Sequence, residues 1–274
     1  MKQTVAKPKR RSALRGKLGH LYYGSRRKLL WVKMRKDFAK SRSEVLLPYT
    51  YMSHKTLLLR RLKDVDMWLQ ENKVVNLRIA AKKLDGILLR PGETFSYWRL
   101  IGKPSKRKGY LPGMILKSGG FISGTGGGLC QMSNLIFWMA LHTPLTVIER
   151  HRHGYDVFPD SNRTQPFGSG ATCFYPHGDL MIRNDTSDTY QLVVKVGKTH
   201  LEGQWRVSDP PEYHYEIEER NHEMSLEYWG GYTRHNELYR KQFDLQGNLL
   251  DEHLVVENHA IMMYAPFLDS SAEK

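Results

Sequence analysis

The chain has 274 residues, of which 40% are hydrophobic, and this is enough apolar material to bury a core in one large domain or two small ones. Its two cysteines exclude a disulfide-stabilised framework. The formal charge of +14 belongs to residues 1–43 alone, because they hold 15 of the 42 Lys and Arg residues and one acid, Asp37, while the remaining residues carry 27 basic and 27 acidic side chains. The charge therefore does not indicate a nucleic-acid-binding surface on the rest of the protein.

Residues 1–43 form a basic N-terminal segment, in which Lys9-Arg10-Arg11 and Arg26-Arg27-Lys28 are interleaved with apolar residues such as Leu29-Leu30-Trp31. A segment of this kind can bind an anionic membrane surface, where each Lys or Arg contributes roughly 1 kcal/mol. It can equally be a solvated tail followed by a helix that docks on its own domain. Non-specific contact with nucleic acid is a third interpretation, but no nucleic-acid-binding motif accompanies the segment, so we expect no specific nucleic-acid partner.

The N-terminus lacks the uninterrupted apolar run that a signal peptide needs after its basic residues. The longest apolar stretch, Leu135 to Ile148, contains His142, Thr143, Pro144 and Thr146 and is too short to span a bilayer. We therefore expect a cytoplasmic protein, either free or peripheral at the inner face of the membrane.

Two helices are predicted after the basic segment, over 55–70 and 73–84. In the first, apolar residues such as Leu58, Leu62 and Leu69 recur with helical spacing. Short strands are predicted at 94–97 and 115–117, and a helix over 130–142. Further strands are expected at 145–149, 153–158, 171–175, 179–183, 190–196, 201–206 and 213–219.

The end of the chain is predicted to contain a β-hairpin, because Asp244 to Asn248 has the composition of a tight turn between 238–243 and 249–256. The whole pattern predicts an α+β fold, in which N-terminal helices precede a mixed, mostly antiparallel β-rich domain with a central helix carrying Cys130. We divide the chain into the basic segment 1–43, a core domain 44–209 and a β-rich C-terminal appendage 210–274.

The glycine-rich run Gly124-Thr125-Gly126-Gly127-Gly128 leads directly to Cys130 at the start of the predicted helix. Unpaired N–H groups at a helix N-terminus favour thiolate over thiol, and the thiolate is the nucleophile and the metal ligand. If Cys130 is a nucleophile, the backbone of Gly126, Gly127 and Gly128 and the side chain of Gln131 are the natural donors to an oxyanion.

The histidines that can serve Cys130 are His151 and His153. A strand from Leu145 that packs back along the helix covers roughly 20 Å in six residues and brings both histidines level with the cysteine. Residues two apart on a strand face the same side, so both imidazoles could address one pocket. A cysteine at a helix start followed by a histidine on a strand resembles papain-like and transglutaminase-like thiol enzymes in arrangement only.

Two other interpretations of Cys130 stay open. It can be a small core residue, with the glycines allowing tight packing of the loop. Alternatively, Cys130, His151 and His153 can bind zinc, although no CxxC or HExxH pattern supports a metal or any other cofactor. Cys173, in the predicted strand 171–175, is expected to be a buried inert thiol.

Several ordered blocks between Asn76 and Asn184 resemble the VanW family, which is named for an accessory protein of B-type vancomycin-resistance gene clusters. The blocks are Asn76 to Gly86, Arg90 to Ser96, the Gly-rich segment with Cys130-Gln131, Glu149 to His153, and Asp179 to Asn184. They cover about 40% of the chain as separated motifs in the right order, so the resemblance is far more specific than one motif. It implies a role linked to glycopeptide resistance or cell-wall metabolism.

The chain departs from the family pattern at two positions. Gly154 stands where many members have a serine after the second histidine, and Gly170 stands where many have an aspartate. An aspartate there would orient a catalytic histidine, which Gly170 cannot do. Asp156 or Asp179 could substitute for it, and spacing does not choose between them.

Two functions are therefore expected. In the first, a thiol-dependent enzyme acts on an amide or ester of a peptidoglycan precursor, with Cys130, His153, His151 and Gln131 as catalytic residues. In the second, a non-enzymatic accessory protein binds a cell-wall precursor or related ligand in a pocket formed by the Gly-rich loop and the histidine strand. Expected substrate-binding residues are Gly126, Gly127, Gly128, Ser133, Asn134, Arg150, Arg152 and Asp179, with the arginines able to hold a carboxylate through bidentate hydrogen bonds.

Overall fold

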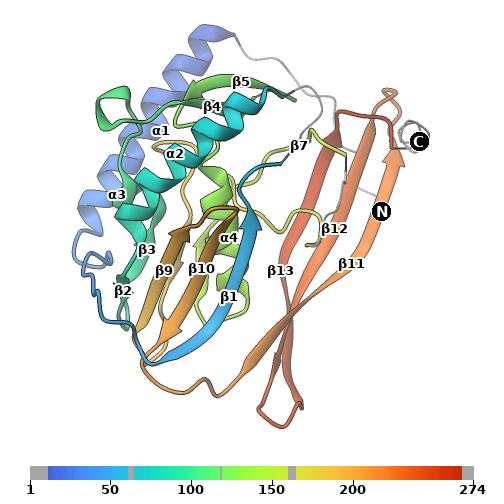
Figure 1. Cartoon of the computed structure of the whole chain (residues 1–274). Helices are drawn as coiled ribbons and strands as arrows, with labels where there is room; N and C mark the ends of the chain where they lie inside the picture. Colours follow the sequence, from blue (N-terminus) through green and yellow to red (C-terminus); the bar gives the residue numbers. More distant parts are fainter. Residues whose placement is uncertain (1–11, 61–64, 118, 160–164, 267–274) are drawn as a thin grey trace.

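The computed structural model describes residues 12–60, 65–117, 119–159 and 165–266 (Figure 1). It has the expected α+β architecture: helices α1 to α4 lie among short strands in the larger part of the protein, and three long strands form a sheet near the C-terminus. The basic triplet Lys9-Arg10-Arg11 lies outside the described residues.

The central sheet has the order β1-β10-β9-β2 and is antiparallel throughout. Its strands are β1 (Tyr49–Leu57), β2 (Ile87–Leu89), β9 (Tyr190–Val196) and β10 (His200–Val207). The side chains of Leu192, Leu201 and Trp205 are completely buried, so this sheet carries much of the apolar core.

The predicted helix over 55–70 is wrong in its first part. Residues Tyr49–Leu57 form β1, and α2 spans Met67–Leu84, while residues 61–64 lie outside the described residues. The end of β1 pairs with the start of β10, Leu57 lying opposite His200. Hydrogen bonds to a strand some 140 residues later in the chain thus prevail over the local apolar spacing. The second predicted helix, 73–84, is confirmed as part of α2.

A second, three-stranded sheet contains β3 (Thr94–Ser96), β8 (Met181–Arg183) and β6 (Thr146–Glu149), in that order. Helix α3 (Tyr97–Ile101) follows β3 directly and is capped by Ser96, whose Oγ accepts from the N–H of Arg99. The predicted strands at 94–97, 145–149 and 179–183 are therefore confirmed within one or two residues.

Helix α4 (Cys130–Leu141) is buried along most of its length and packs against β1, β10 and β6. It follows the hairpin of β4 (Pro112–Lys117) and β5 (Gly120–Thr125), and the Gly-rich turn joins β5 to α4. A 3₁₀ turn, η1 (Lys106–Lys108), precedes β4. The predicted helix beginning at Cys130 is thus confirmed.

The C-terminal sheet is built from β11 (His214–Leu226), β12 (Tyr232–Phe243) and β13 (Leu249–Met262). The predicted turn is confirmed, since Asp244 Oδ1 accepts from the N–H groups of Gln246 and Asn248. A two-residue strand, β7 (Tyr155–Asp156), pairs in parallel with the end of β13. The core segment and the C-terminal sheet are therefore joined by a β-ladder.

Two predicted strands around the histidines are largely wrong. Only Tyr155–Asp156 of 153–158 is a strand, and 171–175 contributes a single bridge between Phe174 and Gly178. The backbone N–H and C=O groups of these segments instead bond to side chains or form isolated hydrogen bonds, such as that from the Thr172 N–H to the His151 carbonyl. The alternation expected for His151 and His153 therefore does not apply.

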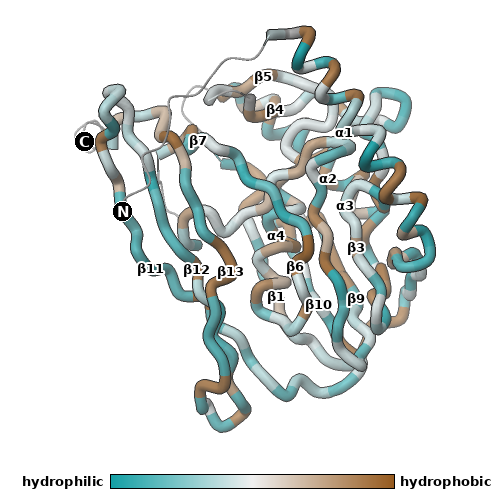
Figure 2. Tube along the Cα trace, turned by 180° about the vertical axis from the view of Figure 1, so that it is seen from behind, coloured by the Kyte–Doolittle hydropathy of each residue, from teal (hydrophilic) through white to brown (hydrophobic). Residues whose placement is uncertain are grey.

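Helix α1 (Ala13–Lys33) lies along the outside of the molecule, and in Figure 2 hydrophobic positions recur along it between hydrophilic ones. Its inward face includes Gly24 and Arg27, which are buried, and the side chain of Trp31. Arg27 donates to the carboxylate of Glu149 and to the carbonyl oxygen of His177, the latter at 2.9 Å. The N-terminal helix thus docks on the core domain, as one of the three interpretations proposed.

Candidate ligand pocket

A cavity of ≈ 1340 Å³ lies beside the Gly-rich turn and the start of α4. Its lining comes from α1, α2, the β4–β5 hairpin, the Gly-rich turn and the segment 165–176. Elements from the first and the middle parts of the chain therefore meet around one space, which is large enough for a ligand of peptide or nucleotide size.

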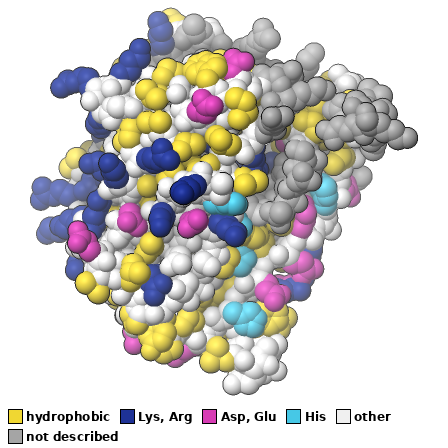
Figure 3. All heavy atoms as spheres, in the orientation of Figure 1, with side chains coloured by type: hydrophobic (Ala, Val, Ile, Leu, Met, Phe, Trp, Pro, Cys, Tyr) yellow, Lys and Arg dark blue, Asp and Glu magenta, His cyan; other side chains and the backbone are white. Residues whose placement is uncertain are grey.

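The charged side chains that line this cavity are all cationic within the described part of the chain. They are Lys28, Arg60, Lys73 and Lys103, and no Asp or Glu accompanies them. Figure 3 shows Lys and Arg gathered over the part of this face where α1 to α3 lie in Figure 1. Four cations without a carboxylate create a positive potential, which favours an anionic ligand.

Lys73 is the most buried of these cations. Its Nζ donates to Gln70 Oε1 at 2.6 Å, and burial, with a smaller contribution from Arg60, lowers the pKa of its ammonium to about 8. A β-carbon at Gly128 would lie 2.2 Å from Lys73 Cγ, so the glycine makes room for the lysine side chain. The Gly-rich turn and Lys73 therefore form one wall of the pocket.

The Gly-rich turn is held by its own backbone. The N–H groups of Gly126, Gly127 and Gly128 donate to the carbonyls of Leu111, Gly124 and Met114, at 2.9–3.0 Å. The buried side chain of Asn76 fixes the turn from α2, donating to the Gly127 carbonyl at 3.0 Å. Because these three N–H groups already have acceptors, they are not free to bind an oxyanion in this structure.

Cys130 lies at the N-terminus of α4 and lines the cavity. Its Sγ donates to the carbonyl oxygen of Cys173 at 3.6 Å. A carbonyl only accepts, so this contact requires the protonated thiol. Burial raises the pKa of the Cys130 thiol and outweighs the lowering effect of the backbone hydrogen bonds at Cys130 and Cys173. The pKa of Cys173 is also raised by burial, as expected for an inert thiol.

His151 and His153 have different surroundings in the structure. His153 lines the cavity together with Cys130, and burial lowers its pKa, which favours a neutral imidazole. His151 Nε2 instead lies 2.8 Å from Glu149 Oε1, the carboxylate that also accepts from Arg27. The sequence prediction that both imidazoles face one pocket therefore holds for His153 and not for His151, because no strand spans them.

The polar residues of the first turn of α4 bind the neighbouring loops. Gln131 donates to Thr56 Oγ1 and to the Leu57 carbonyl, at 2.9 and 2.8 Å, while Ser133 Oγ donates to the Ala171 carbonyl at 2.6 Å. Asn134 Oδ1 accepts from the Ala171 N–H at 2.8 Å. Gln131 and Asn134 line the cavity; Ser133 is not among the described lining residues.

Asn134 also accounts for Gly170. A β-carbon at residue 170 would lie 2.7 Å from Asn134 Oδ1, so an aspartate there would require the asparagine to move. The space in which an aspartate at residue 170 could orient a catalytic histidine is thus filled by the amide of Asn134, which holds the loop.

Three residues expected to bind substrate have partners elsewhere and are absent from the described lining. Arg150 donates to the carbonyls of Gly168 and Gly170 and lies over the Phe137 ring, and the Arg152 guanidinium lies 4.0 Å from the Phe167 ring centroid. Asp179 accepts from Ser96 Oγ and the Trp98 N–H, and burial raises its pKa to about 6. Asp156 accepts from Tyr264 Oη at 2.8 Å, beside the C-terminal sheet.

The cationic lining was not anticipated from the sequence. Lys28, Arg60 and Lys73 come from separate elements, so their convergence depends on tertiary contacts that local patterns do not encode. The ion pair of Arg27 with Glu149 could not be predicted from the local sequence either.

The profile of a family described as VanW like protein matches residues 72–206. The chain is 38% identical over 228 residues to a protein of Enterococcus faecalis named Vancomycin B-type resistance protein VanW, and the match covers 83% of this chain and 82% of that protein. It is also 33% identical over 109 residues to a protein of Bacillus subtilis named Uncharacterized protein YoaR, covering 40% of this chain and 34% of that one.

No solved structure matches the chain. In the described part of the protein, none of the helices combines the length and the apolar character needed to cross a bilayer. The ordered motifs, the family profile and the relative that matches over most of both chains agree, and the chain therefore belongs to the VanW family.

Proposed function

We propose that this protein is an accessory factor of glycopeptide resistance that binds an anionic peptidoglycan precursor in the pocket beside the Gly-rich turn. The observation that carries the proposal is the lining: four cations, two histidines and no described carboxylate, mixed with apolar and backbone groups. Peptidoglycan precursors combine phosphate groups, a sugar and a peptide with a terminal carboxylate. The name of the related protein, Vancomycin B-type resistance protein VanW, supports the link to glycopeptide resistance.

Binding is favoured over catalysis because the groups that a thiol enzyme needs are engaged elsewhere. The Cys130 thiol keeps its proton, the N–H groups of Gly126–Gly128 have backbone acceptors, and Gln131 donates both its amide hydrogens to β1. His153 has no orienting carboxylate at Gly170. A preformed site of this kind can hold a ligand without reacting with it.

The thiol-dependent enzyme remains the second candidate, favoured by one observation: Cys130 and His153 line the same cavity. In that reaction the imidazole of His153 takes the thiol proton, and the thiolate attacks an amide or ester carbonyl of the precursor. The protonated imidazole then returns the proton to the leaving amine or alcohol, which leaves an acyl-enzyme for water or another acceptor to resolve. Ligand binding would first have to release the Cys130 thiol from the Cys173 carbonyl.

Calorimetry with a nucleotide-linked muramyl pentapeptide, a water-soluble precursor, tests the binding proposal. Lys73→Met keeps the length of the side chain and removes the charge, so we expect the affinity to fall about tenfold or more, because hydrogen bonds to charged groups contribute roughly 1.5–3 kcal/mol. Lys82→Met, at an exposed position of the same helix, is the matched control and should bind as the wild type does. Equal affinities of the two variants would contradict the proposal.

We further propose that α1 holds the protein at the inner, anionic surface of the membrane. Its exposed apolar residues Leu14, Leu18, Leu21, Leu29 and Val32 fall within an arc of about 80° at 100° per residue. Arg15, Arg26 and Lys33 border this stripe on one side, and Lys17 and Lys28 on the other. The helix has no acidic residue, so its charge complements anionic lipid.

The stripe adjoins the pocket, since Leu21 and Lys28 also line the cavity. Docking of α1 would therefore bring the pocket to the lipid surface. This arrangement suits a precursor whose phosphate groups lie at that surface.

Vesicle sedimentation tests the membrane proposal. Binding is expected to vesicles that contain phosphatidylglycerol and not to pure phosphatidylcholine, and to weaken as salt rises. The double variant Leu18→Ser/Val32→Ser should lose at least about tenfold in affinity, at roughly 0.8 kcal/mol for each methylene withdrawn from lipid. Leu245→Ser/Leu250→Ser, at exposed apolar positions of the β12–β13 hairpin, is the control. Self-association through the stripe without vesicle binding would assign it to a second copy and contradict the proposal.

A further inference from the structure

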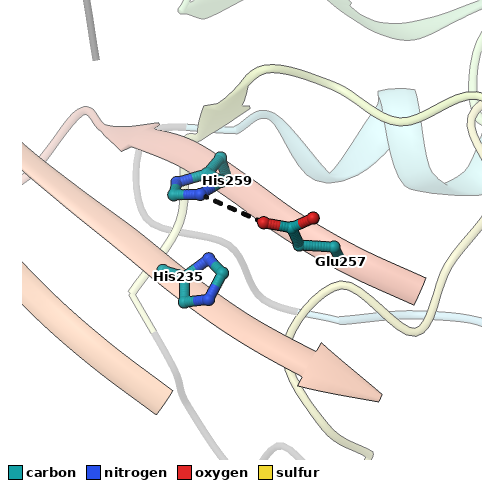
Figure 4. A group of neighbouring side chains, drawn as sticks. All are labelled: His235, Glu257 and His259. Atoms are coloured by element: carbon teal, nitrogen blue, oxygen red, sulfur yellow. Dashed lines mark ion pairs between the residues drawn. The ribbon is translucent and has the colours of Figure 1, made fainter. Parts of the chain in front are cut away.

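Two histidines and a glutamate share one face of the C-terminal sheet, away from the pocket. His235 on β12 pairs directly with His259 on β13, and Glu257 lies two residues before His259 on the same strand. Residues two apart on a strand face the same side, and directly paired residues are neighbours across the ladder. The side chains of all three residues therefore project together, as Figure 4 shows.

Their candidate ligand atoms lie within 4.8 Å of one another, the one group of three His, Cys, Asp or Glu residues that meets this distance in the described chain. His259 Nε2 is 3.7 Å from Glu257 Oε1, and the two imidazole ring centroids are 4.2 Å apart. Two ligand atoms at roughly 2.1 Å from a tetrahedral ion are about 3.4 Å apart, so small side-chain rotations suffice to bind one.

Among the described residues, no strong hydrogen bond to either imidazole explains why the two lie so close together. The contact of His235 Nε2 with Glu237 Oε1 is 3.9 Å, beyond hydrogen-bonding distance, and His235 Nδ1 is buried without a hydrogen-bond partner among the described residues. Neutral imidazoles are the form that binds a metal.

The environment supplies the balancing charge. Glu237 lies directly opposite Glu257 in the ladder and is held by Asn221 Nδ2 at 2.8 Å. Glu223 is paired directly with His235 in the neighbouring ladder, so carboxylates lie on both sides of the histidine pair.

We propose that His235, Glu257 and His259 form a binding site for a divalent transition-metal ion of the zinc class. Two imidazoles and one carboxylate suit zinc and its neighbours rather than magnesium or calcium, which prefer oxygen ligands. The site is distinct from Cys130 and independent of the proposed function. With three protein ligands, it leaves a position for water or an anion, and it links β12 to β13 in the middle of the sheet.

Zinc titration of tag-free, full-length protein against a chromophoric chelator tests this site. The wild type should bind one Zn²⁺ tightly, and His235→Ala and His259→Ala should each lower the affinity at least about tenfold. Co²⁺ should give the intense visible absorption of a tetrahedral site in the wild type and lose it in both variants. His253→Ala is the matched control: His253 also follows an acidic residue by two positions on β13, but Arg240 lies opposite it. Its zinc affinity should not change.

Three outcomes would overturn the proposal: no stoichiometric zinc binding by the wild type, unchanged binding in both His235→Ala and His259→Ala, or loss of binding in Cys130→Ser. Folding of each variant is checked by circular dichroism. As a second measurement, zinc should raise the melting temperature of the wild type and of His253→Ala and leave that of folded His259→Ala unchanged.

Discussion

At the scale of single residues, burial shifts two pocket side chains toward their neutral forms. Lys73 has a pKa lowered to about 8, and Cys130 has a pKa raised above its ordinary range. An anionic ligand offsets the desolvation cost of the Lys73 ammonium, because opposite charges attract. The same ligand disfavours a thiolate at Cys130, because like charges repel. The same pocket therefore favours binding an anion over ionising its cysteine.

The reactivity of Cys130 follows from this. Its labelling by iodoacetamide should rise with a midpoint above the ordinary thiol value of about 8.5, and His153→Ala should leave that midpoint unchanged. Cys173 is the internal control and should react more slowly, being more deeply buried. A midpoint well below 8.5 that is lost in His153→Ala would support the thiol enzyme instead. Cys130→Ser should fold in either case.

Asp179 makes stability depend on pH in a predictable direction. Burial raises its pKa to about 6 in the folded protein, whereas an unfolded chain has about 3.9. The folded state thus binds the proton more tightly, so this group stabilises the protein as pH falls from about 7 to 4 and its contribution is lost as pH rises through 6. Relative to Asp179→Asn, the wild type should gain about 2 kcal/mol between pH 7.5 and 4.5 in denaturant unfolding. A constant difference would show that Asp179 titrates normally.

Local patterns predicted the residues that lie near one another in sequence. Cys130 at a helix start, the Gly-rich turn before it, and His153 in the same pocket all agree with the structure. The role of Glu149, which pairs with His151 and Arg27, could not be predicted, because Arg27 lies 122 residues away. Such pairing is determined by packing alone.

At the scale of elements, α1 contacts the core through ring contacts of His20 and Tyr23 with His177 and of Trp31 with Tyr175, and through one buried charged side chain, Arg27. Arg27 is 8% exposed and donates to Glu149, to the His177 carbonyl and to the Met181 sulfur. Most other side chains of α1 are exposed. One contribution to the docking of this helix therefore comes from an arginine that composition alone would place on a basic surface.

Arg27→Met should destabilise the protein by about 3 kcal/mol, since it leaves the carboxylate of Glu149 partly buried without its arginine, with His151 Nε2 and the Asp179 N–H as its remaining partners. Hydrogen exchange of α1 amides should accelerate in the same variant. Arg26→Met, an exposed neighbour, should change the free energy of unfolding by less than about 0.5 kcal/mol. Equal effects of the two changes would show that Arg27 does not dock the helix.

Elements whose hydrogen bonds are local were predicted well, and those that depend on distant partners were not. Helix α4 and the β12–β13 hairpin needed only periodicity and turn residues. The last three residues of β1, 55–57, are predicted to begin a helix, and the prediction fails there because their partner strand β10 follows by more than 140 residues. The segment 171–175 has strand composition but binds through Ser133, Asn134 and His151.

At the scale of the whole molecule, the fold class and the family followed from the sequence, while the pocket required the assembled structure. The lining comes from elements between α1 and the segment 165–176, so no single motif defines it. The positive charge that composition assigned to the N-terminal segment enters the pocket through Lys28. The remaining cations come from the neutral part of the chain.

The most direct test of the binding proposal is calorimetry of the nucleotide-linked muramyl pentapeptide as a function of pH, with wild type and Lys73→Met. Because the free ammonium of Lys73 has a pKa of about 8 and an anion binds only its charged form, wild-type affinity should be constant below pH 7 and fall as pH rises through 8 to 9.5. Lys73→Met should bind at least about tenfold more weakly at pH 7 and lack this decline. Absence of binding by the wild type, or equal affinity and pH dependence in both proteins, would contradict the proposal that this pocket recognises an anionic precursor.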